Sequence, residues 1–134
     1  MTSFLVHHVS LVVNNIEDAL RFYSILGFSD KYIYRDADGK VEIHHLKNTN
    51  FIIELFKYKI GSGSTEVSNN ETKIGIEHFS MQVEDIDNAF EELTKQNVKI
   101  LTPITAGRTG INYFFISDPD GNKIEIVEDK RVLV

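Results

Sequence analysis

An internal repeat constrains this chain more than any other feature. His8-Val9-Ser10-Leu11-Val12-Val13 aligns with His78-Phe79-Ser80-Met81-Gln82-Val83, which begins 70 residues later and keeps the His, Ser and Val identical. The segments around Glu54 and Glu125 close the two copies and lie 71 residues apart. Because only two copies fit within 134 residues, the pattern indicates a duplicated supersecondary unit rather than a repeat array.

Each copy has the periodicity of a β-α-β-β-β unit. In the first copy, apolar and polar residues alternate over 4–13, which predicts a strand. A helix follows, with Asn15 as its N-cap and Gly27 as the left-handed residue that ends it. The three further strands of this copy are expected at 29–35, 40–47 and 51–58.

The second copy repeats this order. Its helix is expected at 86–96, with Asp85 as N-cap and Asn97 in the place of Gly27, since Asn tolerates the left-handed conformation. Asp118-Pro119-Asp120-Gly121-Asn122 is a strong turn pattern between the last two strands. The four strands of this copy are expected at 75–83, 98–104, 110–117 and 122–128.

These elements predict an α+β fold made of two tandem βαβββ modules in a single domain, 1–134. Module one is expected at 4–60 and module two at 74–128. Between them, residues 61–73 are rich in Gly, Ser, Thr and Asn, which is typical of a connector.

Composition narrows the function classes. The net charge of −6 argues against a nucleic-acid partner, which requires a basic face. The absence of cysteine excludes a disulfide scaffold, a thiolate metal site and a cysteine nucleophile. No basic leader or long apolar run is visible, so we expect no membrane segment and a cytoplasmic protein.

Four good metal ligands occupy equivalent points of the two copies: His8, Glu54, His78 and Glu125. Because side chains alternate along a strand, each of them should project from the face opposite an apolar stripe. Two such faces would enclose a polar cavity. Imidazole and carboxylate groups are suitable ligands for Zn, Ni, Co, Mn or Fe. An open position on the ion could polarise a bound oxygen, and a Glu could act as a general base.

Strand alternation also assigns faces to the remaining histidines and to two aromatic residues. His7 should point away from His8 and be structural. His44 and His45 are adjacent on one strand, so one of them should face the cavity, although a surface or structural role is the simpler interpretation. Tyr113 and Phe115 share a face that lines either the cavity or the helix.

The motifs together resemble the vicinal oxygen chelate superfamily, which includes glyoxalase I, methylmalonyl-CoA epimerase, fosfomycin-resistance proteins, extradiol dioxygenases and bleomycin-binding proteins. The resemblance covers nearly the whole chain. Its most specific part is the segment from Asp118 to Glu125, and it also includes His8-x-Ser-Leu-x-Val, Phe22-Tyr23-x-x-Leu26-Gly27-Phe28, Ile53-Glu54-Leu55 and Glu77-His78-Phe79. The implied fold is an eight-stranded, cup-shaped mixed sheet around a divalent metal.

The four ligand positions match the pattern of glyoxalase I. The resemblance therefore implies a lactoylglutathione-lyase-like metalloenzyme, a homodimer that acts on a small oxygen-chelating substrate through a metal-bound enediolate. In this reading His8 and His78 anchor the ion, and Glu54 or Glu125 moves the proton. One alternative is a non-haem iron dioxygenase-like enzyme that uses His8, His78 and Glu125. Another is a small-molecule binding or resistance protein without catalysis.

Overall fold

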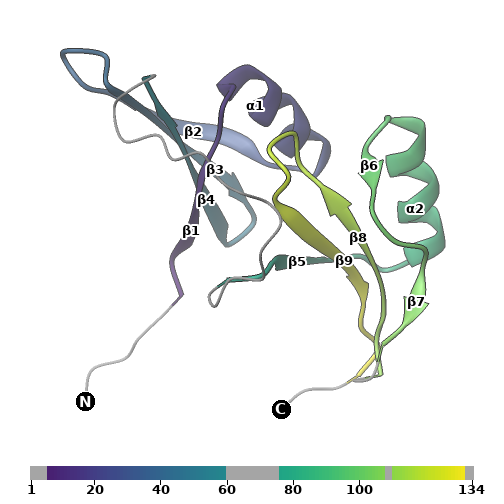
Figure 1. The fold of residues 1–134 in the computed structure, drawn as a ribbon. Coiled ribbons are helices and arrows are strands. Elements are labelled where there is room, and N and C mark those ends of the chain that lie inside the picture. Colours follow the sequence, from purple (N-terminus) through teal and green to yellow (C-terminus); the bar gives the residue numbers. More distant parts are fainter. Residues whose placement is uncertain (1–5, 60–75, 108–109, 132–134) are drawn as a thin grey trace, which may run out of the picture. The chain divides into compact units, whose positions relative to one another are not determined.

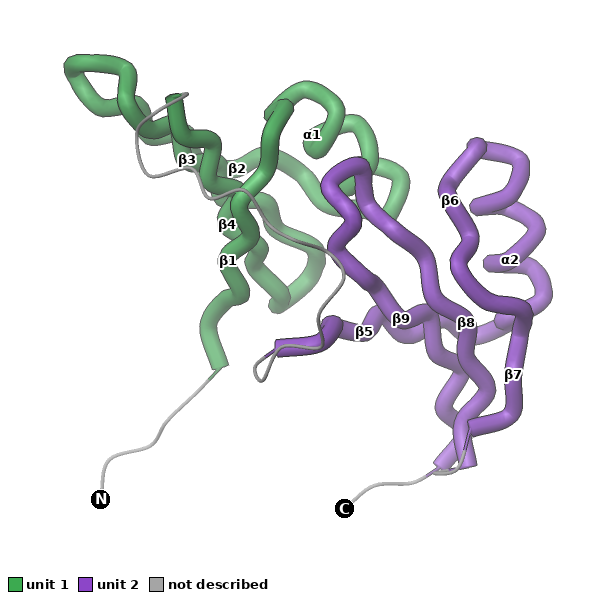
Figure 2. Tube along the Cα trace, viewed as in Figure 1, with its two compact units in different colours: residues 1–69 green, residues 70–134 purple. Residues whose placement is uncertain are grey.

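The computed structural model describes residues 6–59, 76–107 and 110–131. The chain divides into two compact units, 1–69 and 70–134, which Figure 2 distinguishes by colour. The expected connector at 61–73 lies outside the described residues, as do the first residues of the strand expected from 4. Unit 1 has the predicted β-α-β-β-β arrangement and unit 2 has the same order with one additional short strand, so the α+β fold class is confirmed (Figure 1).

Unit 1 contains a mixed sheet with the strand order β1-β4-β3-β2, in which only the β1–β4 pair is parallel. Helix α1 follows β1 along the chain and contacts β2 and β4 (Figure 1). The elements are β1 (His8–Val12), α1 (Ile16–Ile25), β2 (Ser29–Arg35), β3 (Val41–Asn48) and β4 (Phe51–Tyr58).

The core of unit 1 forms from one face of this sheet and one face of α1. On the sheet, Leu46, Ile53 and Leu55 are almost fully buried, and on the helix Ala19 and Tyr23 are fully buried. Burial of each large apolar side chain contributes about 1.5–3 kcal/mol relative to exposure. This packing fixes which face of every strand is turned away from the helix, and that second face carries the candidate ligands.

Local signals end the helices as predicted. The side chain of Asn15 accepts a hydrogen bond from Asp18 N at the start of α1, and Asp85 caps α2 in the same way. Gly27 and Asn97 follow the two helices with φ of 90° and 60°. Left-handed backbone therefore reverses the chain after each helix.

Unit 2 has a corresponding sheet with the order β5-β9-β8-β6, and a further short strand, β7, also pairs with β8. Its apolar face is formed by Phe114, Ile116, Ile124 and Ile126, all at most 2% exposed. The elements are β5 (Phe79–Gln82), α2 (Ile86–Lys95), β6 (Lys99–Ile100), β7 (Thr105–Ala106), β8 (Asn112–Ser117) and β9 (Lys123–Glu128).

One strand differs from the prediction. The continuous strand expected at 98–104 is divided into β6 and β7. Between these, Phe115 N donates its hydrogen bond to the Thr102 hydroxyl at 2.9 Å instead of to a backbone carbonyl. Pro103 follows and has no N–H to donate, so regular pairing with β8 is interrupted there.

The predicted turn at Asp118 has a clear physical basis. The Asp118 carboxylate is buried, and its Oδ1 accepts hydrogen bonds from the backbone N of Asp120 at 2.9 Å and of Asn122 at 2.7 Å. Gly121 adopts φ of 85° within the turn. This network aligns β8 with β9 and thereby sets which β8 residue lies opposite Glu125.

Candidate metal centre

In unit 1, a single cross-strand row carries polar side chains over four strands. Ser10 of β1 lies opposite Glu54 of β4, Glu54 lies opposite His45 of β3, and His45 lies opposite Tyr32 of β2. Their neighbours Ile53 and Leu55 are fully buried on the helix side. The row therefore belongs to the face that the helix leaves uncovered.

Both oxygens of Glu54 are held within this row. Oε1 accepts a hydrogen bond from the Ser10 hydroxyl at 2.8 Å and lies 2.6 Å from His8 Nε2. Oε2 lies 2.7 Å from Nε2 of His45. The Glu54 side chain is 15% exposed, whereas His8 and His45 are 36% and 37% exposed. The carboxylate is thus nearly covered and the two imidazoles border it.

Unit 2 has an equivalent row with one important difference. Ser80 of β5 lies opposite Glu125 of β9, and Glu125 lies opposite Phe115 of β8. The Ser80 hydroxyl donates to Glu125 Oε1 at 2.5 Å, and His78 Nε2 lies 3.9 Å from the same oxygen. Within the described part of the chain, Glu125 Oε2 receives no hydrogen bond. The residues that the structure describes therefore hold the carboxylate of unit 2 at one oxygen only.

The imidazole of unit 2 has its own support. His78 Nδ1 lies 3.1 Å from Glu77 Oε2, which leaves Nε2 as the nitrogen directed toward Glu125. Lys123 pairs with Glu77, and its ammonium lies 4.8 Å from the ring centre of Phe115. The hydrogen bond from Lys123, followed by that from His78, lowers the pKa of the Glu77 carboxyl below its usual value. Glu77 is therefore ionised at neutral pH and orients the His78 ring.

The structure decides two of the open sequence alternatives. His45 lies on the same face as Glu54, whereas His44 is 3% exposed on the helix side. Phe115 lies on the ligand face, where its ring is 4.9 Å from that of His78. The prediction for His7 is wrong: its side chain is exposed, and its Nδ1 lies 2.9 Å from Nδ1 of His8.

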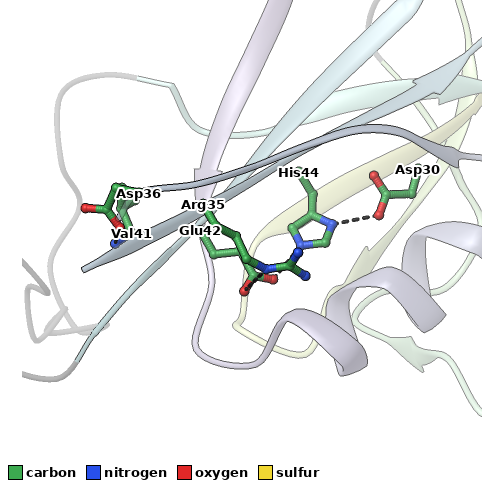
Figure 3. Close-up of polar contacts among 6 residues, drawn as sticks. All are labelled: Asp30, Arg35, Asp36, Val41, Glu42 and His44. Atoms are coloured by element: carbon green, nitrogen blue, oxygen red, sulfur yellow. Dashed lines mark hydrogen bonds and ion pairs between the residues drawn. The ribbon is translucent and has the colours of Figure 1, made fainter. Parts of the chain in front are cut away.

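His44 lies between two carboxylate side chains, which Figure 3 shows. Its Nδ1 lies 2.6 Å from Asp30 Oδ2, and its Nε2 lies 2.6 Å from Glu42 Oε2. The hydrogen bond from His44, together with Arg35, lowers the pKa of the Glu42 carboxyl. Because Asp30 belongs to β2 and His44 to β3, the contacts tie these two strands together beneath the helix.

The predicted ligands thus form two pairs, His8 with Glu54 in unit 1 and His78 with Glu125 in unit 2. Their imidazole nitrogens and carboxylate oxygens are the donors that divalent transition metals prefer, so the donor chemistry fits such an ion. Among the described residues, no three His, Asp or Glu side chains form a complete cation site. A site with four ligands would need both pairs.

Two partners of the candidate ligands were not predicted from the sequence. They are His45, which contacts Glu54 in unit 1, and Glu77, which contacts His78 in unit 2. A signal for His45 was present. The two residues between β3 and β4 fix Asn48 opposite Phe51, and counting outward from that pair places His45 opposite Glu54. Glu77 gives no comparable signal, because it precedes β5 and pairs through its side chain.

Comparison with known proteins identifies the family of the chain. The family model of the Glyoxalase/Bleomycin resistance protein/Dioxygenase superfamily matches residues 5–126. The chain is 30% identical to the Escherichia coli K12 protein YaeR over 125 residues, which are 92% of this chain and 95% of YaeR. This protein therefore belongs to the Glyoxalase/Bleomycin resistance protein/Dioxygenase superfamily.

Solved structures share the fold. A glyoxalase family protein from Enterococcus faecalis superposes with a TM-score of 0.81 at 24% identity, covering 92% of this chain and 97% of that one. The trypanothione-dependent glyoxalase I of Leishmania major superposes with a TM-score of 0.73 at 22% identity, covering 96% and 88%. At these identities the likeness concerns the fold.

No helix in the described residues is long and apolar enough to cross a membrane.

Proposed function

We propose that this protein is a glyoxalase-I-like lyase or isomerase that depends on a divalent metal and acts on a small substrate with neighbouring oxygens. The observation that carries the proposal is the paired arrangement of His and Glu on the exposed face of each module, at equivalent register positions. His8, Glu54, His78 and Glu125 would share one ion. The two modules that complete the site come either from one chain or from two chains of a homodimer.

The donor set leaves room for a substrate on a five- or six-coordinate ion of Zn, Ni, Co, Mn or Fe. When bound, such an ion supplies a Lewis acid that polarises a substrate carbonyl. The residues of this chain provide the rest. His8 and His78 would each use Nε2, and Glu77 keeps His78 in that orientation through Nδ1.

Glu125 is the better candidate for the proton carrier. Its Oε1 is held by Ser80, and no described residue donates to its Oε2. A carboxylate with one oxygen available can remove a proton from the carbon beside the carbonyl and return it to the neighbouring carbon. The net reaction is an isomerisation, so no oxidant or reductant is consumed. Glu54, held at both oxygens, is better placed as a fixed ligand.

A second candidate function is a non-haem iron dioxygenase-like activity. The observation that favours it is that both carboxylate oxygens of Glu54 already have partners. These partners are His8, Ser10 and His45. If Glu54 keeps its contacts with Ser10 and His45 while His8 turns to the ion, His8, His78 and Glu125 remain as a two-histidine, one-carboxylate set. In both cases we expect a cytoplasmic protein with a small-molecule substrate.

The test is reconstitution of metal-free protein under anaerobic conditions. We expect turnover of the hemithioacetal of methylglyoxal and a thiol, either glutathione or trypanothione, with Ni²⁺ or Co²⁺ and without oxygen. The product should be the 2-hydroxy thioester, with the proton moved between adjacent carbons. Strict dependence on Fe²⁺ and consumption of oxygen with a catechol would favour the dioxygenase. Failure to bind any divalent ion near stoichiometrically would leave a small-molecule binding or resistance protein as the better assignment.

A further inference from the structure

We propose that His45 is a positioning residue of the metal site, which holds Glu54 so that the carboxylate offers a single oxygen, Oε1, to the ion. This inference rests on the proposed function and assigns a role to a residue outside the four expected ligands. The geometry that carries it is the division of contacts at Glu54. His45 Nε2 lies 2.7 Å from Oε2, while His8 and Ser10 bond Oε1.

The contacts at the two oxygens would respond differently to an ion. When His8 Nε2 binds a cation, its present contact with Oε1 of Glu54 would be replaced. That oxygen would then be available to the same ion, apart from the hydrogen bond from Ser10. The contact of His45 with Oε2 need not change, so the carboxylate would keep its orientation and bind through one oxygen.

The position of His45 is itself supported from both sides. Its backbone lies opposite Glu54 on β4 and opposite Tyr32 on β2. The rings of Tyr32 and His45 have centroids 5.5 Å apart, so the tyrosine contacts the imidazole from the side of β2. The Glu54 side chain is only 15% exposed, which gives the contact of His45 with its carboxylate more weight than one in open solvent.

The equivalent position in module two identifies this as a specialised feature. Phe115 lies opposite Glu125, as His45 lies opposite Glu54, and a phenyl ring cannot donate to the carboxylate. Since both modules keep the serine that bonds Oε1, the difference concerns the second oxygen alone. One glutamate is therefore held at two oxygens and the other at one.

The experiment measures Ni²⁺ affinity by competition with a chelator, using wild-type protein, His45→Gln and His45→Asn. The Gln amide nitrogen reaches the position of Nε2, whereas that of Asn stops one bond short of it. We expect His45→Asn to lower affinity about tenfold, the usual scale for the loss of an outer partner of a ligand, and His45→Gln to retain most of it. Equal affinity of all three proteins would overturn the proposal.

A double-mutant cycle with Glu54→Ala separates positioning from direct binding. If His45 acts through Glu54, its removal should cost little once Glu54 has been changed, so the two losses should not add. Additive losses would mean that His45 acts independently of Glu54, and they would overturn the positioning role. Thermal unfolding checks that each variant is folded.

The outcomes also distinguish this inference from the proposed function. If wild-type protein binds no ion, the metal site fails and the role of His45 fails with it. If wild-type protein binds an ion and His45→Asn binds it equally well, the site stands and only the role of His45 is rejected. If Glu54→Ala does not change affinity, Glu54 is no ligand, and the three-ligand alternative replaces both assignments of that residue.

Discussion

The two modules share a framework but support their functional side chains in different ways. In both, a strand serine bonds one oxygen of the glutamate on the neighbouring parallel strand. Module one then adds His45 at the second oxygen of its glutamate, whereas module two adds Glu77 behind its histidine. The two modules thus carry equivalent pairs of His and Glu, but module one holds the carboxylate more fully and module two supports the imidazole.

The same divergence extends to the helix side of each sheet. His44 lies opposite Leu55, and Phe114 lies opposite Ile126, at equivalent points of the two registers. His44 is buried between Asp30 and Glu42, whereas Phe114 packs in an apolar core. Module one therefore has a histidine paired with carboxylates at two positions where module two has phenylalanine. One of these positions is on the ligand face and the other is in the core.

Removal of a ligand from module two should have the largest effect. We expect His78→Ala and Glu125→Gln each to lower Ni²⁺ affinity more than about a hundredfold, because loss of a direct ligand should exceed the loss of an outer partner. The measurement is chelator competition. Gln82→Ala, on the same face of β5, is the matched control and should bind normally. Wild-type affinity in both ligand variants would remove these residues from the site.

Phe115→His would make module two resemble module one. An imidazole opposite Glu125 could bond its second oxygen, so the carboxylate should transfer a proton less readily. We expect kcat to fall about tenfold, which is less than the loss of a whole general base would cost, and we expect KM to change little. Steady-state kinetics with the hemithioacetal substrate provides the test. An unchanged kcat would indicate that the free oxygen of Glu125 has no part in turnover.

Glu77→Ala would remove the support that only module two gives to its histidine. Since Glu77 is 58% exposed, its contact with His78 should be weaker than that of a buried partner, and we expect a loss of Ni²⁺ affinity of about threefold to tenfold. Lys123→Gln tests whether the neighbouring cation matters and should have a smaller effect. A loss as large as that of His78→Ala would instead place Glu77 among the ligands.

The smallest effect concerns stability. The hydrogen bond from His44, and then Arg35, lowers the pKa of Glu42 from an ordinary value of 4.5. Because the folded-state pKa is the lower one, this stabilisation is complete above pH 4.5 and is lost as the pH falls through the folded-state value.

We therefore expect Glu42→Gln to destabilise the protein by about 1 kcal/mol at neutral pH, a modest value because the side chain is partly exposed. The difference from wild type should shrink as the pH falls below 4.5. Urea unfolding across this range measures both proteins. A difference that is independent of pH would mean that the ionisation of Glu42 does not contribute.

Much of this arrangement could be predicted from the sequence, since alternation along a strand assigns each side chain to a face. The opposite faces of Glu54 and its buried neighbours Ile53 and Leu55 follow directly from that rule. The caps at Asn15 and Asp85 also depend on neighbouring residues alone. These local features need no knowledge of the tertiary structure.

Features that depend on contacts between strands were harder to predict. The break between β6 and β7 requires the Thr102 hydroxyl to meet Phe115 N on another strand. The role of Glu77 depends on Lys123, 46 residues away. Only the pairing of His45 with Glu54 could have been counted, from the short turn that fixes the register.

The most direct test of the central claim is a Ni²⁺ titration of metal-free protein by calorimetry, comparing wild type with His8→Ala and His78→Ala. If His8, Glu54, His78 and Glu125 share one ion, wild type should bind one ion per chain, and each single variant should weaken that same binding event. Two ions per chain in wild type, with one retained at full affinity in each variant, would show that the modules bind separately and would contradict the shared site.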